Sequence, residues 1–188
     1  MRSTRSNEKS AGPAPTWHRD WRGWLASSFL ALALIWTVAP AHALEAPGGP
    51  VILTVDGKIT VTNASDGTAT FDRAMIEALG VTEIVTETLW TDGPIRFEGA
   101  RVRDLLTAVG AQGTSVHAIA INDYGVDIPI SDFQDYDVIM AYRANGKTMR
   151  IRDKGPLWII YPWDDMPELR DEVHHERAIW QLKRLTVK

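Results

Sequence analysis

Loops between predicted strands carry the side chains best suited to bind a ligand or a partner. A tryptophan in a loop must pack on the protein or contact a partner, and charged groups beside it can orient a bound molecule. We therefore expect two tryptophans to supply apolar contact and the charged residues to position the ligand. The alternative, that both tryptophans only cap the sheet edges, stays open. The candidate binding residues are Trp90, Asp92, Asp123, Tyr124, Arg152, Lys154, Trp163 and Asp164.

Several chemistries are excluded by residue type. The chain has no cysteine, so it forms no disulfide, no thiolate zinc site, no iron–sulfur cluster and no thiol nucleophile. No serine lies in a nucleophile elbow, and no glycine-rich loop matches a phosphate-binding or dinucleotide-binding fingerprint. Any metal must therefore be held by histidine, carboxylate or backbone groups.

The histidines give weak signals for a metal. His174 and His175 stand beside Asp171, Glu172 and Glu176, and in a helix Asp171 and His175 share one face. This spacing matches no established metal motif, so we expect a solvated charged loop and keep metal binding as a second alternative function. His117 lies in an apolar strand pattern, which favours a hydrogen-bonded core histidine over a ligand.

The elements that must position these loops are mostly strands. Recurring apolar residues predict helices over 71–79 and 102–109, each followed by glycine. Residues 89–100 are expected to form a loop, and 166–177 a loop or weak helix. Asp56-Gly57 and Asn145-Gly146 predict hairpins. Residues rich in β-branched and apolar side chains predict strands over 51–55, 58–62, 81–88, 116–121, 138–144, 147–151, 157–161 and 178–187. The predicted class is α+β, a mixed β-rich domain with a few short helices.

Residues 1–43 have the layout of a signal peptide. A basic stretch precedes the uncharged run Leu25–Ala39, and Ala41-His42-Ala43 matches a cleavage pattern. No arginine pair precedes the run, which favours the Sec route and a periplasmic or secreted protein; an uncleaved anchor is the alternative. Cleavage leaves no membrane span. We expect a flexible lead-in over 44–50 and a single domain over 51–188.

The charge balance bears on the kind of partner. The formal net charge is −4, and residues 1–43 hold a basic excess, so the remainder is more acidic still. An acidic domain is a poor match for the phosphate backbone, which excludes nucleic acid as a partner. A small ligand or a periplasmic protein is the expected partner, and its identity is open.

Four stretches of the chain resemble the molybdopterin-binding domain of the sulfite oxidase superfamily. The resemblance implies a mixed α+β fold built around β-sheet and barrel-like elements. It also implies a molybdenum ligand, a cysteine at the end of the strand that precedes the first stretch. The stretches are FEGARVRDLL at 97–106, DVIMAYRANG at 137–146, GPLWIIYP at 155–162 and WQLKRLTV at 180–187.

The chain departs from this family pattern where the cofactor would bind. Residues 86–90, which match the position of the metal ligand, hold no cysteine. Trp158 stands in place of the arginine that helps to hold the anionic pterin, and Trp163, Asp164 and Asp165 replace basic residues after Pro162. We therefore expect a periplasmic binding or accessory protein of this fold without molybdenum cofactor. The alternative is a molybdopterin-dependent oxidoreductase, the one function under which molybdopterin would be the cofactor.

Overall fold

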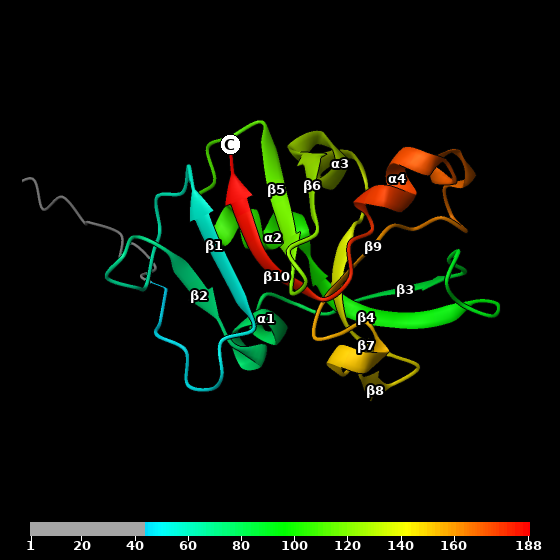
Figure 1. The fold of residues 1–188 in the computed structure, drawn as a ribbon, viewed down its shortest axis with the longest axis horizontal. Helices are drawn as coiled ribbons and strands as arrows, with labels where there is room; N and C mark the ends of the chain where they lie inside the picture. Colours follow the sequence, from blue (N-terminus) through cyan, green and yellow to red (C-terminus); the bar gives the residue numbers. More distant parts are fainter. Residues whose placement is uncertain (1–43) are drawn as a thin grey trace, which may run out of the picture. The chain divides into compact units, whose positions relative to one another are not determined.

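Two five-stranded β-sheets form the frame of residues 44–188, the part of the chain that the computed structural model describes (Figure 1). The first sheet has the order β2-β1-β10-β5-β6. Strand β1 runs parallel to β10, and the other pairs are antiparallel. The first and the last strand of the described residues therefore lie side by side within this sheet. Its strands are β1 (Leu53–Gly57), β2 (Ala69–Phe71), β5 (Ser115–Ala120), β6 (Gly125–Pro129) and β10 (Leu182–Val187).

The second sheet is wholly antiparallel and is organised around β7. Strand β7 pairs with β4, β8 and β9. The four residues from Ile139 to Tyr142 are fully buried, as expected of a central strand covered on both faces. The strands are β3 (Thr82–Thr86), β4 (Ile95–Arg101), β7 (Ile139–Ala144), β8 (Lys147–Thr148) and β9 (Trp158–Ile160).

Four short α-helices and two 3₁₀ turns complete the described residues. Asp72 caps the first helix by accepting from the Met75 amide at 2.9 Å, and Asp171 caps the last by accepting from the His174 amide at 2.8 Å. Ten strands against four short helices confirm the β-rich α+β class. The elements are α1 (Arg73–Ala78), α2 (Val102–Ala108), α3 (Ile130–Asp135), α4 (Glu172–Arg177), η1 (Ile151–Asp153) and η2 (Pro167–Leu169).

One hydrophobic core joins the two sheets. Leu53 and Leu185 from the first sheet, Phe97 from the second and Leu105 from α2 are all completely buried in it. Stability without disulfides therefore rests on apolar burial. Within residues 44–188, no helix is long and apolar enough to span a membrane.

Many predicted elements are confirmed. Helices α1 and α2 lie within the predicted ranges, and β3, β5, β7, β9 and β10 coincide with predicted strands. The Asn145-Gly146 turn joins β7 to β8, with Ala144 opposite Lys147. The predicted loop or weak helix over 166–177 contains η2 and α4.

Two predictions are wrong, and the strands predicted over 147–151 and 178–187 are shortened to Lys147–Thr148 and Leu182–Val187. Asp56-Gly57 makes no hairpin, because β1 pairs with β2 and β10 and residues 58–62 form no strand. The backbone NH of Lys58 donates to Val187 O at 3.0 Å instead. Gly57 has φ +86°, and a Cβ there would lie 2.1 Å from that same oxygen. The predicted loop over 89–100 includes most of β4, which fills the space between β3 and β7.

The predicted signal peptide, residues 1–43, lies outside the described residues. The lead-in over 44–50 contains no helix or strand, but it is tied to the domain at two points. The Gly49 amide donates to Asp72 Oδ2 at 2.7 Å, and Asn63 Nδ2 donates to the Glu45 carbonyl at 2.7 Å. Strand β6 and helix α3 follow the candidate residue Tyr124 and have no counterpart in the sequence-based prediction.

Candidate functional site

A pocket of about 510 Å³ opens between α4, the loop before β4 and the turn between β5 and β6. We call it the Trp90 pocket. Three loops contribute to it, with lining residues within 89–90, 122–124 and 178–180. Its apolar wall is made of Leu89, Trp90, Ala120, Ala178, Ile179 and Trp180.

A cluster of tryptophans fixes this wall. The Trp90 and Trp180 rings meet edge to face, with centroids 4.9 Å apart, and Trp158 packs against both at 6.0 and 6.3 Å. Trp158 is buried, and its indole NH donates to the Ala178 carbonyl at 3.0 Å. Trp158 thereby anchors the two rings that line the pocket.

Lys154 adds a cation to the far side of this cluster. Its ammonium lies 4.3 Å from the Trp180 ring centroid, 5.4 Å from that of Trp158 and 5.9 Å from that of Trp90. These distances are typical of cation–π contacts. The structure thus brings together two predicted site residues, Trp90 and Lys154, although Lys154 does not line the Trp90 pocket.

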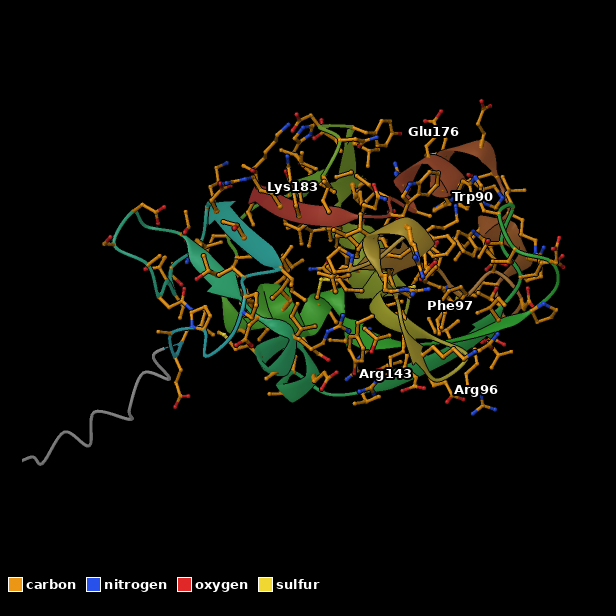
Figure 2. The ribbon with its side chains drawn as sticks, turned by 60° about the horizontal axis from the view of Figure 1, so that its bottom comes forward. Trp90, Arg96, Phe97, Arg143, Glu176 and Lys183 are labelled. Atoms are coloured by element: carbon orange, nitrogen blue, oxygen red, sulfur yellow. The ribbon has the colours of Figure 1, made fainter. Side chains whose placement is uncertain are left out.

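The polar wall comes mainly from one face of α4. Glu172, His175 and Glu176 are spaced i, i+3 and i+4, so one helix face presents all three to the pocket. Asn122 and Tyr124 from the β5–β6 turn complete this wall. Figure 2 shows Glu176 on α4 and Trp90 in the loop before β4.

The charges of α4 divide into two groups. Burial is the main reason that the pKa of His175 lies below its ordinary value, so its imidazole is neutral at pH 7. Within residues 44–188, its Nδ1 has no hydrogen-bond partner. His174 contacts Asp171 at 2.8 Å, and Arg177 pairs with Asp132 at 2.9 Å. Glu172 and Glu176 have no ion-pair partner among the described residues.

A buried network holds α4 in place. Asp132 of α3 accepts from the Tyr161 hydroxyl at 2.8 Å and from Arg177 at 2.9 Å. Burial and the neighbouring carboxylate raise the pKa of Tyr161 far above its ordinary value, so this hydroxyl stays a donor. The network therefore links the pocket helix to the core.

Trp163 lies in a different environment from the one the sequence predicted. It is completely buried and packs between Tyr161 and His175, with ring centroids 5.8 and 5.3 Å away. Its side chain therefore supports the pocket from behind and offers no surface to a ligand. The expectation of a surface contact at Trp163 is corrected, since the adjacent aromatic rings cover it.

The other candidate residues are spread over the surface. Tyr124 lines the Trp90 pocket, but its neighbour Asp123 pairs with Lys183 at 2.6 Å in a separate hollow of about 440 Å³. We call this second hollow the Lys183 hollow; Arg184 also lines it. Asp92 is exposed and lines neither of them.

Asp164 and Arg152 do not line the Trp90 pocket and instead contact other residues of the protein. The Asp164 carboxylate accepts from the Thr86 hydroxyl at 3.1 Å and the Glu87 amide at 3.2 Å, and it pairs with Arg170. It therefore fastens the end of β3. Arg152 is exposed beside Asp153. His117 is hydrogen-bonded, as expected, and its partner is Asp127 at 2.7 Å. The expectation that His117 lies in the core is wrong, because its side chain is partly exposed.

Sequence reasoning missed part of the pocket. Trp180 and Ile179 were assigned to the closing strand, and Glu172 and Glu176 to a solvated charged loop. The i, i+3, i+4 spacing of Glu172, His175 and Glu176 was the available signal. Among the described residues, no group of three histidine, aspartate or glutamate side chains is placed to hold a metal ion.

Comparison with known families decides the relationship. The profile of the oxidoreductase molybdopterin binding domain matches residues 58–164. The chain belongs to this family. A comparison with curated proteins finds no match.

A solved structure supports the fold of this family member. The fold described above is similar to the crystal structure of the sulfane dehydrogenase SoxCD from Paracoccus pantotrophus, with a TM-score of 0.52 and 16% sequence identity. The match covers 72% of this chain and 37% of the SoxCD chain, so the chain spans little more than a third of that protein. At this identity the likeness shows the fold alone.

The residues of this family member do not fit the molybdopterin cofactor. The segment in which the resemblance implies the metal ligand, residues 86–90, ends in the Trp90 pocket and offers hydroxyls and an indole, with no thiol. A soft metal–thiolate bond has no donor here. Trp158, which stands where the resemblance implies an arginine, is packed in the core. The pocket is lined by two glutamates and by no lysine or arginine, so it would repel a pterin phosphate.

Proposed function

We propose that this domain is a small-molecule binding or accessory module of the molybdopterin-binding fold, that it holds no molybdenum cofactor, and that the Trp90 pocket is its binding site. One observation carries the proposal. A partly apolar, aromatic pocket of about 510 Å³ lies at the end of the segment in which the resemblance implies the metal ligand, and no lysine or arginine lines it. Pockets of roughly 300–1,000 Å³ with a few polar groups are typical of small-molecule sites.

The location belongs to the same proposal. The uncharged run Leu25–Ala39, followed by Ala41-His42-Ala43, supports export to the periplasm through the Sec route. That route carries unfolded chains, whereas the resemblance implies a cofactor inserted into folded protein in the cytoplasm. Export by Sec and the absence of a cysteine therefore support the same conclusion independently.

A molybdopterin-dependent oxidoreductase is the second candidate function, because the family profile matches residues 58–164. It predicts molybdenum and pterin in equimolar amounts in the native protein. The donor set of the Trp90 pocket argues against it, since cofactor recognition relies on a thiolate and on arginine or lysine side chains.

The first experiment separates these two functions. The full-length precursor is expressed in a host that makes molybdenum cofactor, and the exported protein is purified without chelator. Elemental analysis and pterin fluorescence are expected to find neither molybdenum nor pterin. About one molybdenum per chain would overturn the proposal in favour of the oxidoreductase.

The second experiment locates the ligand site. Small aromatic and aliphatic compounds are screened by the quenching of tryptophan fluorescence. Trp90→Ala is expected to lose the response, because it removes the main apolar wall. Val85→Ala is the matched control, since Val85 is exposed on β3 and does not line the pocket. Equal responses from both variants would place binding elsewhere.

A further inference from the structure

We propose that the Trp90 pocket selects an organic cation, a substituted ammonium group on an apolar body, over a neutral or anionic molecule of the same shape. This inference rests on the proposed function and names the ligand class of the same site. Three features of the pocket carry it: its aromatic walls, its unpaired carboxylates and the absence of lining cations.

The aromatic walls supply the first part of the recognition. Trp90 and Trp180 meet at an interplanar angle of 72°, so they form two walls of a corner. Indole faces carry negative electrostatic potential and attract ammonium groups, most strongly where water is excluded. Leu89 and Ile179 add apolar surface for the body of the ligand. The corner therefore suits an alkylated ammonium better than a hydrated inorganic ion.

The carboxylates supply the charge. Glu172 and Glu176 line the pocket and have no ion-pair partner among the described residues. Two other carboxylates already have partners in the chain, since Asp164 pairs with Arg170 and Asp132 pairs with Arg177. His175 between the two glutamates is neutral at pH 7 because burial lowers its pKa. The pocket wall thus carries two negative charges available to an incoming cation.

Lys154 shows that this tryptophan cluster accepts an ammonium group. Its Nζ sits 4.3 Å from the Trp180 centroid, on a side of the cluster that faces a different hollow. The cluster is therefore a cation-binding surface occupied on one side by the chain itself. The charge of Lys154 also opposes a second cation, but Lys154 lines a different hollow, whereas the two glutamates line the Trp90 pocket directly.

The experiment compares three probes that share one shape. Benzyltrimethylammonium, its neutral carbon isostere neopentylbenzene and the anion phenylmethanesulfonate are titrated into the protein, and binding is followed by tryptophan fluorescence. We expect the cation to bind about tenfold more tightly than the isostere, and the sulfonate not to bind. Because surface charges are screened by salt, the preference for the cation should shrink as ionic strength rises.

Variants test the source of the preference. The double variant Glu172→Gln with Glu176→Gln should reduce the preference for the cation over the isostere, with affinity for the isostere unchanged, and the preference that remains measures the contribution of the tryptophan rings. Glu168→Gln is the matched control, because Glu168 is exposed and does not line the pocket. Lys154→Met should strengthen cation binding by a few fold, since it removes the opposing charge.

Each outcome separates the two proposals. Equal binding of the cation and the isostere by the unmodified protein would overturn the cation preference and leave the proposed binding function standing. Stronger binding of the sulfonate would also overturn it and indicate an anion site. If the cation does not bind at millimolar concentration, the cation preference fails, and the screen of aromatic and aliphatic compounds against Trp90→Ala decides the binding function by itself.

Discussion

Two hollows flank the β5–β6 turn, and neighbouring residues of that turn enter different ones. Tyr124 lines the Trp90 pocket, whereas Asp123 lines the Lys183 hollow. Both hollows contain charged side chains, but they use them differently. In the Lys183 hollow Lys183 pairs with Asp123, and Arg184 with Asp56; Figure 2 shows Lys183 on β10, apart from Glu176.

The difference lies in which charges remain available. The charges of the Lys183 hollow are satisfied within the chain, so they offer little to a ligand. The glutamates of the Trp90 pocket have no such partner among the described residues, and two tryptophans line the same pocket. Charge in a hollow therefore indicates a binding site only when the fold leaves it unpaired.

The largest expected effect concerns the support behind the Trp90 pocket. Trp163 is completely buried against His175 and Tyr161, so Trp163→Ala should lower the free energy of unfolding by about 3–5 kcal/mol. Trp90→Ala, which removes a half-buried ring, should lower it less. Urea denaturation measures both. A loss at Trp90 equal to that at Trp163 would show that the pocket wall is itself part of the stabilising core.

The next effect concerns the network that positions α4. Asp132→Ala leaves Arg177 and the Tyr161 hydroxyl without their partner, and breaking a buried ion pair costs about 3 kcal/mol. Amide exchange in α4 should accelerate, and cation binding in the Trp90 pocket should weaken. Tyr161→Phe is the matched control and should cost about 1 kcal/mol, because the ion pair survives. Unchanged exchange in α4 would separate the pocket from this network.

The sequence predicted the frame of the molecule better than the pocket. Apolar periodicity located α1, α2 and the central strands, because burial on one or both faces leaves a local pattern. The Asp56-Gly57 signal failed because β1 pairs with β2, which begins only at Ala69, and with β10 at the far end of the chain, and no local pattern encodes these pairings. The resemblance stretches located the family fold, which the profile match confirms.

The site was predicted in part for a related reason. Trp90 and Tyr124 were both candidate binding residues, and both line the Trp90 pocket. Trp163 could not be told from Trp90, because burial depends on which distant ring packs over a loop residue; here His175 does. Trp180 was missed because its neighbours read as a strand, while the structure gives it only an isolated bridge to Trp158.

A pH effect on stability should arise at the Trp90 pocket. The pKa of His175 is lowered from 6.5, mainly by burial; Arg170 and His174 lower it further, and Asp171 opposes them. The unfolded chain therefore binds this proton more readily than the folded one. The stabilisation is complete above pH 6.5 and is lost as the pH falls from there to the lowered pKa of the folded state.

Urea denaturation at pH 7.5 and 5.5 tests this effect, with His175→Gln as the comparison. The unmodified protein should lose more stability between the two values than the variant does. Equal losses would show that the imidazole is solvated in the folded protein. The matched control is His117→Gln, because His117 contacts Asp127 and does not line the Trp90 pocket.

The smallest effect is expected at the Lys183 hollow. Lys183→Met removes an exposed ion pair with Asp123, and such pairs contribute about 0–1 kcal/mol. The variant should also bind benzyltrimethylammonium as the unmodified protein does, because the lysine does not line the Trp90 pocket. A change in that affinity would show that the β5–β6 turn couples the two hollows, since Asp123 and Tyr124 are adjacent in it. The paired charges of the Lys183 hollow would then set the position of Tyr124, and the contrast between a satisfied hollow and an available one would become a dependence of one on the other.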